Sequence, residues 1–308
     1  DSPPMTANAE ASKTIRLGCV GVDSSHLPEF TKRIHALRDA GETGCTVTHS
    51  FDAGPHFLPE SDVAEWTAAT RGMGVEEAGS MDELLDAVDG VLVLSVNGHE
   101  HLGHALPALE RGLPTYVDKP LTCDLAQAKQ LRAAAKQSGA RCYSASSLRF
   151  VSELETLGDL GDIVAVDVVG PGELNDAMEG LFFYGVHSIE LVDALMGPGV
   201  EAVQATGGTD RDFVRFRYDD GRSASIRLER RGSYAFAATV HGTEHCKSFV
   251  VDFGPVYGRL VAGMCRFFEG GPAPVDLDRL IENIAVMEAG NRSMASDGEW
   301  VEVVSGKC

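Results

Sequence analysis

Short apolar runs alternate with helical stretches along the first half of the chain, and this alternation restricts the fold more than any other feature. The runs cover residues 14–22, 45–52, 90–95, 115–117 and 141–145. Stretches with helical periodicity separate each run from the next. Strands that alternate with helices form a parallel sheet whose faces the helices cover. We therefore predict an α/β domain with a doubly wound parallel sheet for residues 13–148.

The pattern changes after residue 148, where strand-like runs follow one another with turn residues between them. These runs are residues 163–169, 213–218, 223–228 and 235–240. One helix is predicted over residues 188–196, and two more over residues 258–269 and 277–289. This order is typical of an α+β domain with a largely antiparallel, open sheet, which we predict for residues 149–308. Residues 1–12 are small and polar, and we expect a disordered or tag-derived leader there.

Composition excludes several classes of protein. The 308 residues suit two domains, and a formal net charge of -20 argues against a nucleic-acid or anionic-membrane partner. The seven cysteines are scattered without a CxxC pair, which indicates neither a disulfide framework nor a zinc knuckle. No apolar run has the length of a membrane span. We expect a cytoplasmic protein that acts on a small molecule.

Asp118-Lys119-Pro120 directly follows the predicted strand over residues 115–117. Open α/β sheets bind their ligands at the carboxyl ends of the strands, so Lys119 is placed where a ligand is expected. Asp118 can orient the ammonium, and Pro120 prevents a helix from starting there. A lysine in a partly dry cleft can move protons. The alternative is a surface turn with a solvated charge pair.

Further motifs follow one another in a characteristic order over nearly the whole chain. They are the strand over residues 15–22, Ser95-Val96-Asn97 with His101, Asp118-Lys119-Pro120, Arg149-Phe150, residues 185–193 and Ser296-Asp297-Gly298. In these motifs the chain resembles the glucose-fructose oxidoreductase / inositol dehydrogenase / MocA (Gfo/Idh/MocA) family. Members are nicotinamide-dependent dehydrogenases of sugars and polyols. The resemblance implies an N-terminal Rossmann domain and a C-terminal substrate and oligomerisation domain.

The resemblance assigns cofactor binding to the turn after the first strand. The family motif is Gly-x-Gly-x-x-Gly, and the corresponding residues here are Gly21, Val22, Asp23, Ser24, Ser25 and His26. Only the first glycine is retained. Asp23 places an acid where phosphate charge is expected, and His26 places a ring where the family has no side chain. The amides of a helix N-terminus still favour an anion. The alternative is a turn that has lost dinucleotide binding.

The same resemblance implies further cofactor contacts at the ends of later strands, by Asp52, Ser95, Asn97, His101, Asp118 and Lys119. A carboxylate such as Asp52 at the end of the second strand can bind the ribose hydroxyls and disfavours a 2′-phosphate. The expected cofactor is therefore NAD, and NADP is less favoured. Val96 stands where the family often has proline.

Lys119, His187 and Tyr184 are the expected catalytic residues. The resemblance implies that the lysine polarises or deprotonates the reacting hydroxyl, and a histidine titrates near neutral pH. The family has an aspartate four residues before this histidine and another three after it, where this chain has Phe183 and Glu190. The expected substrate-binding residues are Lys119, Arg149, Tyr184, His187 and Glu190.

A second set of polar side chains raises the question of a metal. His99, Glu100, His101 and His104 follow the fourth strand, and Asp23 and His26 follow the first. Histidine and carboxylate side chains together can bind zinc. Because His101 matches a family position that needs no metal, we predict none.

These features lead to one main hypothesis and two alternatives. The main hypothesis is an NAD-dependent oxidoreductase of a sugar, cyclitol or related polyol. The alternatives are a non-redox enzyme that uses tightly bound NAD or a metal for elimination or hydrolysis, and a binding protein with a degenerate nucleotide site. By analogy with the family, the open sheet packs against another subunit, which predicts a homodimer or homotetramer.

Overall fold

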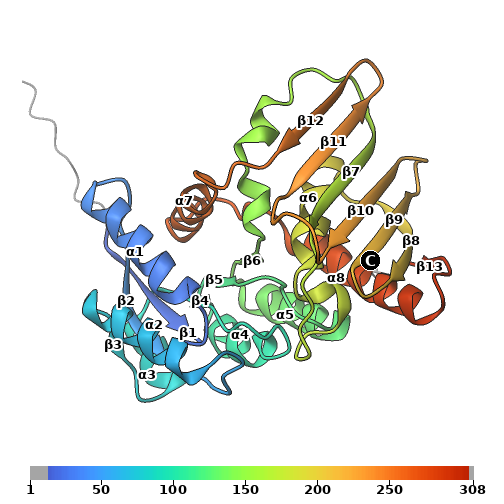
Figure 1. The fold of residues 1–308 in the computed structure, drawn as a ribbon. Coiled ribbons are helices and arrows are strands. Elements are labelled where there is room, and N and C mark those ends of the chain that lie inside the picture. The colour runs from blue at the N-terminus through green and yellow to red at the C-terminus, as the bar shows by residue number, and fades with distance from the viewer. Residues whose placement is uncertain (1–12, 305–308) are drawn as a thin grey trace, which may run out of the picture.

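The computed structural model describes residues 13–304 and contains two sheets that lie side by side (Figure 1). The first has six strands in the order β3-β2-β1-β4-β5-β6, and all neighbouring strands are parallel. Its strands are β1 (Ile15–Val20), β2 (Cys45–Phe51), β3 (Glu76–Glu77), β4 (Gly90–Val93), β5 (Thr115–Val117) and β6 (Cys142–Ser144). This arrangement confirms the predicted doubly wound parallel sheet.

Five helices follow these strands in turn. They are α1 (His26–Asp39), α2 (Glu60–Gly72), α3 (Met81–Ala87), α4 (His101–Glu110) and α5 (Leu125–Ser138). Side chains cap two of them, since the Ser80 hydroxyl accepts from the Glu83 amide at 3.1 Å and the Asp124 carboxylate accepts from the Gln127 amide at 2.7 Å. Because all the strands are parallel, their carboxyl ends lie at the same edge of the sheet.

The second sheet has the order β12-β11-β7-β10-β9-β8-β13, and its pairs are antiparallel except for β7 with β10. Its strands are β7 (Ile163–Pro171), β8 (Val200–Gly207), β9 (Arg211–Tyr218), β10 (Ser223–Glu229), β11 (Ala237–Gly242), β12 (Cys246–Val250) and β13 (Val301–Glu302). The predicted largely antiparallel sheet is confirmed. β3, β8 and β12 were not predicted. β3 and β12 are poorly buried and lack an apolar face, while Glu201 and Gln204 interrupt the apolar pattern of β8.

Three α-helices and three short 3₁₀ helices accompany the second sheet. They are η1 (Ser147–Phe150), η2 (Ser152–Thr156), η3 (Gly180–Phe182), α6 (Gly185–Met196), α7 (Val256–Phe268) and α8 (Leu277–Ala295). α6 and α8 pack against one face of the sheet. The other face is open, and Phe213 and Val250 on it are 43% and 65% exposed. The sheet therefore presents apolar side chains to solvent.

α7 joins the two halves, because it packs beside α1 although it belongs to the second half of the chain (Figure 1). Glu269, which follows α7, accepts hydrogen bonds from the Thr43 hydroxyl at 2.5 Å and the Gly44 amide at 2.9 Å. A boundary between residues 148 and 149 lies between the two sheets. α7 and Glu269, however, contact the first half of the chain across this boundary. The predicted leader, residues 1–12, lies outside the described residues. Between residues 13 and 304, no helix is long and apolar enough to cross a membrane.

Replacing Gly21 with alanine is expected to destabilise the fold more than the same change at Gly41. Both glycines have positive φ, at 87° and 75°, so both variants strain the backbone. A Cβ at Gly21 would also lie 2.6 Å from the Ser95 amide nitrogen, whereas nothing lies within 4 Å of a Cβ at Gly41. We expect the free energy of unfolding in urea to fall by about 1–3 kcal/mol more at Gly21. An equal loss of unfolding free energy in the two variants would mean that the segment after β4 moves to accommodate the added methyl group.

Candidate active site

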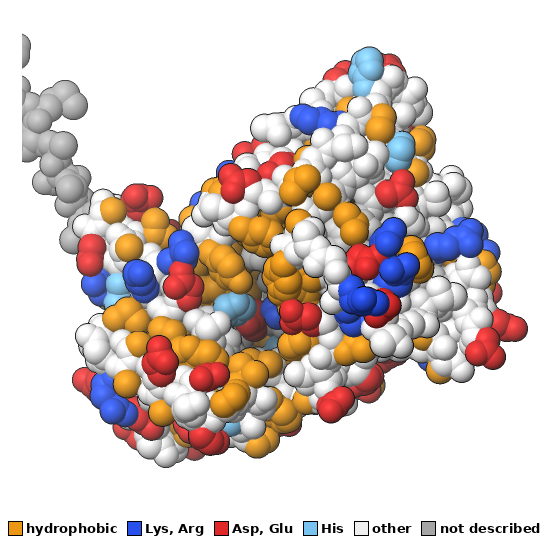
Figure 2. Space-filling view, viewed as in Figure 1, with side chains coloured by type: hydrophobic (Ala, Val, Ile, Leu, Met, Phe, Trp, Pro, Cys, Tyr) orange, Lys and Arg blue, Asp and Glu red, His pale blue; other side chains and the backbone are white. Residues whose placement is uncertain are grey.

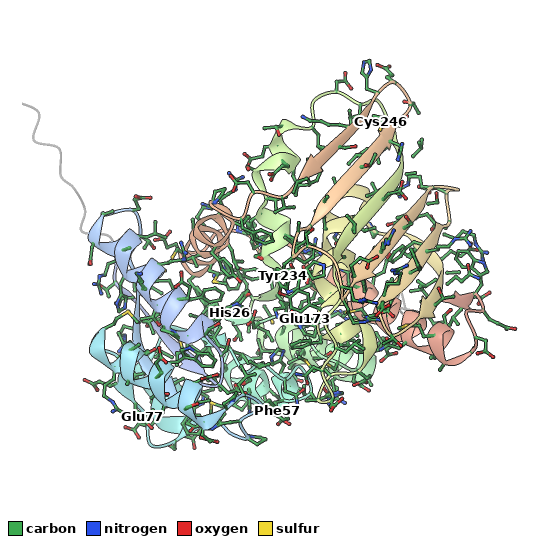
Figure 3. All side chains as sticks on the ribbon, in the orientation of Figure 1. His26, Phe57, Glu77, Glu173, Tyr234 and Cys246 are labelled. Carbon is green, nitrogen blue, oxygen red and sulfur yellow. The ribbon has the colours of Figure 1, made fainter. Side chains whose placement is uncertain are left out.

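A hollow lies between the two sheets at the carboxyl ends of β1 and β5, where His26 meets Asp118. Figure 2 shows apolar side chains over much of its wall, with histidine, acidic and basic side chains at its base. His26 borders this hollow from the first half of the chain, and Glu173 and Tyr234 border it from the second (Figure 3). The site is therefore built by both halves.

Asp118 and Lys119 follow β5, as the sequence predicts, and Asp118 is 4% exposed. The Asp118 carboxylate accepts from the Lys119 amide at 2.9 Å, and its other oxygen lies 2.5 Å from Nδ1 of His26. Burial alone would raise the pKa of the Asp118 carboxyl, but the nearby His26 and Lys119 outweigh it and hold that pKa well below its usual range. Asp118 therefore stays ionised.

The structure brings Lys119 and His187 to the same hollow. Lys119 is partly exposed, and within residues 13–304 its ammonium has no hydrogen bond or ion pair. His187 lies in the first turn of α6, with Nδ1 2.7 Å from the Ser146 hydroxyl. Burial and then the charge of Lys119 lower the pKa of His187 well below its usual value. His187 is thus a neutral imidazole beside an ammonium.

Aromatic rings cover one side of His187. Tyr184 lies edge-on to its ring at a centroid distance of 5.1 Å, and Phe236 lies 6.0 Å away. Tyr234 contacts Tyr184 at 5.7 Å, and Phe253 contacts Phe236 at 5.9 Å. We call these four residues the aromatic wall. Of them only Tyr184 was predicted, because the others lie in a loop, at a strand end and beyond β12, where the motifs offer no guide.

The turn over residues 21–26 retains the donors that an anion needs. Within the described chain, the backbone amides of Asp23, Ser24 and Ser25 have no acceptor, and they precede the first turn of α1. The Asp23 carboxylate faces away from these amides, because it accepts from the amides of Phe57 and Val96, each at 3.2 Å. Three free amides at a helix N-terminus fit a diphosphate.

Residues 21–24 of this turn are buried, and the Ser24 hydroxyl accepts from the His26 amide at 3.1 Å. Asp23 was expected to disturb the turn. It instead ties the turn to the loop after β2 and to the end of β4. The residues present therefore fit a dinucleotide, although two of the three glycines are missing.

The remaining expected cofactor residues have different surroundings. Asp52 follows β2, and its carboxylate accepts from the Gly54 amide at 3.0 Å while remaining partly exposed. Ser95 and Asn97 follow β4, and both are 4% exposed. The Ser95 hydroxyl lies 2.6 Å from Nδ1 of His104. Nε2 of His56 also lies 2.9 Å from the Asp52 Oδ1 that accepts from Gly54, so Oδ2 of Asp52 is the oxygen left for a ligand, whereas Ser95 and Asn97 are buried.

The prediction that His101 binds the cofactor is wrong. Its side chain is fully buried, and its ring nitrogens each lie 2.8 Å from a carbonyl oxygen, of Ser95 and of Pro120. His101 therefore joins the segment after β4 to the Lys119 turn, and no polar atom of the ring is left for a ligand.

Arg149 and Glu190 are likewise not placed to bind a substrate. The Arg149 guanidinium lies 2.5 Å from both the Glu190 and the Asp193 carboxylates, and all three side chains are 7% exposed or less. Glu190 also accepts from the Ser146 amide at 2.8 Å. Both partners are used in this buried network, which fixes η1 against α6.

The histidines considered for a metal do not converge. His99 lies 3.1 Å from Glu179, His101 is held between two carbonyls, and His104 lies against Ser95. Among residues 13–304, no three such side chains are grouped so that they could hold an ion. Each of these histidines has a separate partner.

His104 is expected to make the fold less stable in mild acid. Burial and then His101 lower its pKa from 6.5 to about 4, so the unfolded chain binds a proton before the folded chain does. Stability is therefore full above pH 6.5 and falls as the pH drops towards about 4. His104→Gln should keep the hydrogen bonds and lose less stability over this range, which urea unfolding at several pH values would measure. Parallel pH curves for both proteins would contradict this assignment.

Two contacts of the site were missed from the sequence. His26 was assigned to the cofactor and not to Asp118, and Tyr257 of α7 was not considered. The Tyr257 hydroxyl lies 3.5 Å from Nε2 of His26. No local pattern connects residues that are more than two hundred positions apart.

Comparison with known proteins agrees with this fold. A family model for the Gfo/Idh/MocA oxidoreductases, described as an NAD-binding Rossmann fold, matches residues 54–146. An uncharacterized oxidoreductase of Escherichia coli K12, YhhX, is 33% identical over 132 residues, which is 38% of each chain. An uncharacterized oxidoreductase of Streptococcus pneumoniae is 25% identical over 201 residues, 55% of this chain and 54% of the relative. The chain thus matches about half or less of these relatives' lengths.

Two solved structures share the fold over nearly the whole chain. GenD2 from gentamicin A biosynthesis, in complex with NAD, superposes with a TM-score of 0.79 at 20% identity over 97% of this chain and 99% of GenD2. Levoglucosan dehydrogenase, in complex with NADH and levoglucosan, gives 0.77 at 17% identity over 95% and 100%. The two sheets agree with the fold of these structures, and residues 54–146 match the Gfo/Idh/MocA family of oxidoreductases.

Proposed function

We propose that the protein is an NAD-dependent oxidoreductase of a sugar, cyclitol or related polyol. The observation that carries this proposal is the unpaired Lys119 ammonium beside the neutral His187 ring, at the strand ends of a Rossmann sheet. Such a pair can handle the proton of an alcohol. The match to the family model and solved neighbours with NAD or NADH support the redox class.

The cofactor would be held by the turn over residues 21–26 and by Asp52. The free amides of Asp23, Ser24 and Ser25 would receive the diphosphate, and the Asp52 carboxylate would accept from ribose hydroxyls. A carboxylate there repels a 2′-phosphate, which favours NAD over NADP. When bound, the nicotinamide supplies the acceptor for a hydride from the substrate carbon.

Lys119 and His187 would act on the substrate hydroxyl. The Lys119 ammonium donates to the alcohol oxygen and stabilises the negative charge that develops as the proton leaves. His187, held by Ser146, presents a neutral imidazole that accepts this proton. Asp118 remains a carboxylate behind Lys119 and accepts from its backbone amide, which fixes the turn.

The aromatic wall supports a ring-shaped substrate. Tyr234 is 59% exposed at the hollow, and its ring and those behind it suit the apolar C–H face of a sugar or cyclitol. Burial and then Glu173 raise the pKa of Tyr234 to about 12, so its hydroxyl remains a donor. The Glu173 carboxylate beside it can accept from substrate hydroxyls. Tyr184 lies between this surface and His187.

The open face of the second sheet is the surface through which the protein would assemble. The face carries the exposed apolar side chains of Phe213 and Val250, and we place a second copy of the chain there, as a homodimer or homotetramer. A monomeric mass in light scattering would contradict this assembly.

Five cysteines are buried free thiols, which suits a reducing, cytoplasmic setting: Cys19, Cys45, Cys123, Cys142 and Cys265.

The first experiment is a calorimetric titration of the purified protein with NAD and NADP, followed by an absorbance assay of nicotinamide reduction with a panel of sugars and cyclitols. We expect NAD to bind more tightly than NADP and one class of cyclic polyol to be oxidised. Absence of NAD binding would refute the proposal and favour a binding protein. Bound NAD with turnover but no net reduction would favour the non-redox alternative.

A further inference from the structure

His26 occupies an unusual place at the start of α1, where three neighbours fix its ring. The ring stacks on Phe30 at a centroid distance of 4.6 Å and meets the edge of Tyr257 at 5.8 Å. Its Nδ1 lies 2.5 Å from the Asp118 carboxylate, and the side chain is 17% exposed. His26 therefore has one nitrogen fixed by a carboxylate and a route to solvent.

The partner determines which nitrogen carries the proton. Asp118 is ionised, because its pKa lies well below the usual range, and an ionised carboxylate only accepts hydrogen bonds. Nδ1 of His26 must therefore be the protonated nitrogen that donates. Nε2 is left for a second partner, and the Tyr257 hydroxyl lies 3.5 Å from it, at the outer limit of a hydrogen bond. Within residues 13–304, Nε2 is thus held by this one long contact alone.

His26 and His187 have opposite surroundings in the same hollow. His187 lies beside a cation and a hydroxyl, and burial and then Lys119 lower its pKa although Asp118 acts to raise it. His26 lies beside an anion and is partly exposed. A buried imidazole that charges with difficulty cannot retain a proton taken from a substrate. His26 instead has a carboxylate at 2.5 Å from Nδ1 and a partly exposed ring.

We propose that His26, held by Asp118, relays the substrate proton between the hollow and solvent. This relay rests on the proposed oxidation of an alcohol. In that reaction the substrate carbon would give a hydride, with its two electrons, to a bound nicotinamide, and the substrate oxygen would give one proton. The proton that His187 accepts from the substrate passes to Nε2 of His26 and then to water. Asp118 stays ionised and Nδ1 stays protonated, so the pair returns to its starting state and no further oxidant is needed.

The kinetic test uses His26→Gln and His26→Gly, with His35→Gln as the control on the same helix. Both variants leave Lys119 and His187 in place, and His35 bonds only β2 in this region. We expect kcat at saturating NAD and substrate to fall about 10- to 100-fold in both His26 variants. Added imidazole should restore kcat in His26→Gly. An unchanged kcat, or a loss that imidazole does not restore and that parallels a loss of NAD affinity, would overturn the relay.

A second readout needs neither cofactor nor substrate. In the protein with ¹⁵N-labelled histidine, His26 should show a protonated Nδ1 with a far-downfield proton signal, and Asp118→Asn should abolish that signal. A neutral ring protonated at Nε2 instead would overturn the relay. If the wild-type protein does not bind NAD, the proposed oxidation is wrong. The His26 tautomer would then still show whether Nδ1 donates to Asp118, independently of the cofactor.

Discussion

Replacement of Lys119 with methionine is expected to lower kcat about 10²- to 10⁴-fold while NAD affinity and the unfolding temperature change little. Methionine keeps the length of the side chain and removes the charge. The ammonium has no partner within residues 13–304, so its loss breaks no structural contact. What disappears is the proposed donor to the substrate oxygen and a cation that, after burial, lowers the pKa of His187. Steady-state kinetics with NAD and the best polyol of the panel would measure the effect.

Lys136→Met is the matched control, because Lys136 is exposed in the last turn of α5. It should retain full activity. His187 should also change in Lys119→Met, since removal of the neighbouring cation raises the pKa of the imidazole relative to the native protein. A Lys119→Met protein that oxidises its substrate at the native rate would refute the assignment of both residues.

The structure explains why the strand ends could be predicted and their contacts could not. Lys119 lies at the end of β5 because apolar runs and helices alternate, and this alternation is a local property of the sequence. Asp118 could be assigned to the ligand edge for the same reason. Its partner His26 lies 92 positions earlier and required the three-dimensional arrangement of β1, β5 and α7.

The altered glycine turn is a second case in which the sequence did not predict the side-chain contacts. Asp23 and His26 each replace a family glycine, and from the sequence both indicated damage to a phosphate site. In the structure each side chain has its own acceptor or donor: Asp23 binds the amides of Phe57 and Val96, and His26 binds Asp118. The direction in which a side chain leaves a turn decides whether it blocks the ligand, and the motif alone does not give that direction.

Replacement of Arg149 with methionine is expected to lower the free energy of unfolding by about 3–5 kcal/mol. Glu190 would keep only the Ser146 amide, and Asp193 would keep Arg279 at 3.0 Å. Burial disfavours the charged guanidinium, but Glu190 and Asp193 outweigh it and raise the pKa of Arg149. Removal of this cation leaves two buried carboxylates without the cation that they share, and an uncompensated buried charge is costly. Urea unfolding at neutral pH would measure the loss.

Arg132→Met supplies the comparison, because Arg132 pairs with Asp278, whose side chain is 76% exposed. An exposed pair contributes about 0–1 kcal/mol, so this variant should unfold almost as the native protein does. The contrast also decides between two roles for Arg149. If Arg149→Met were as stable as Arg132→Met but bound substrate much more weakly, the substrate contact predicted from the sequence would be correct. A large loss of stability instead identifies the buried network as the structure that holds η1, and with it Ser146 and His187, in position.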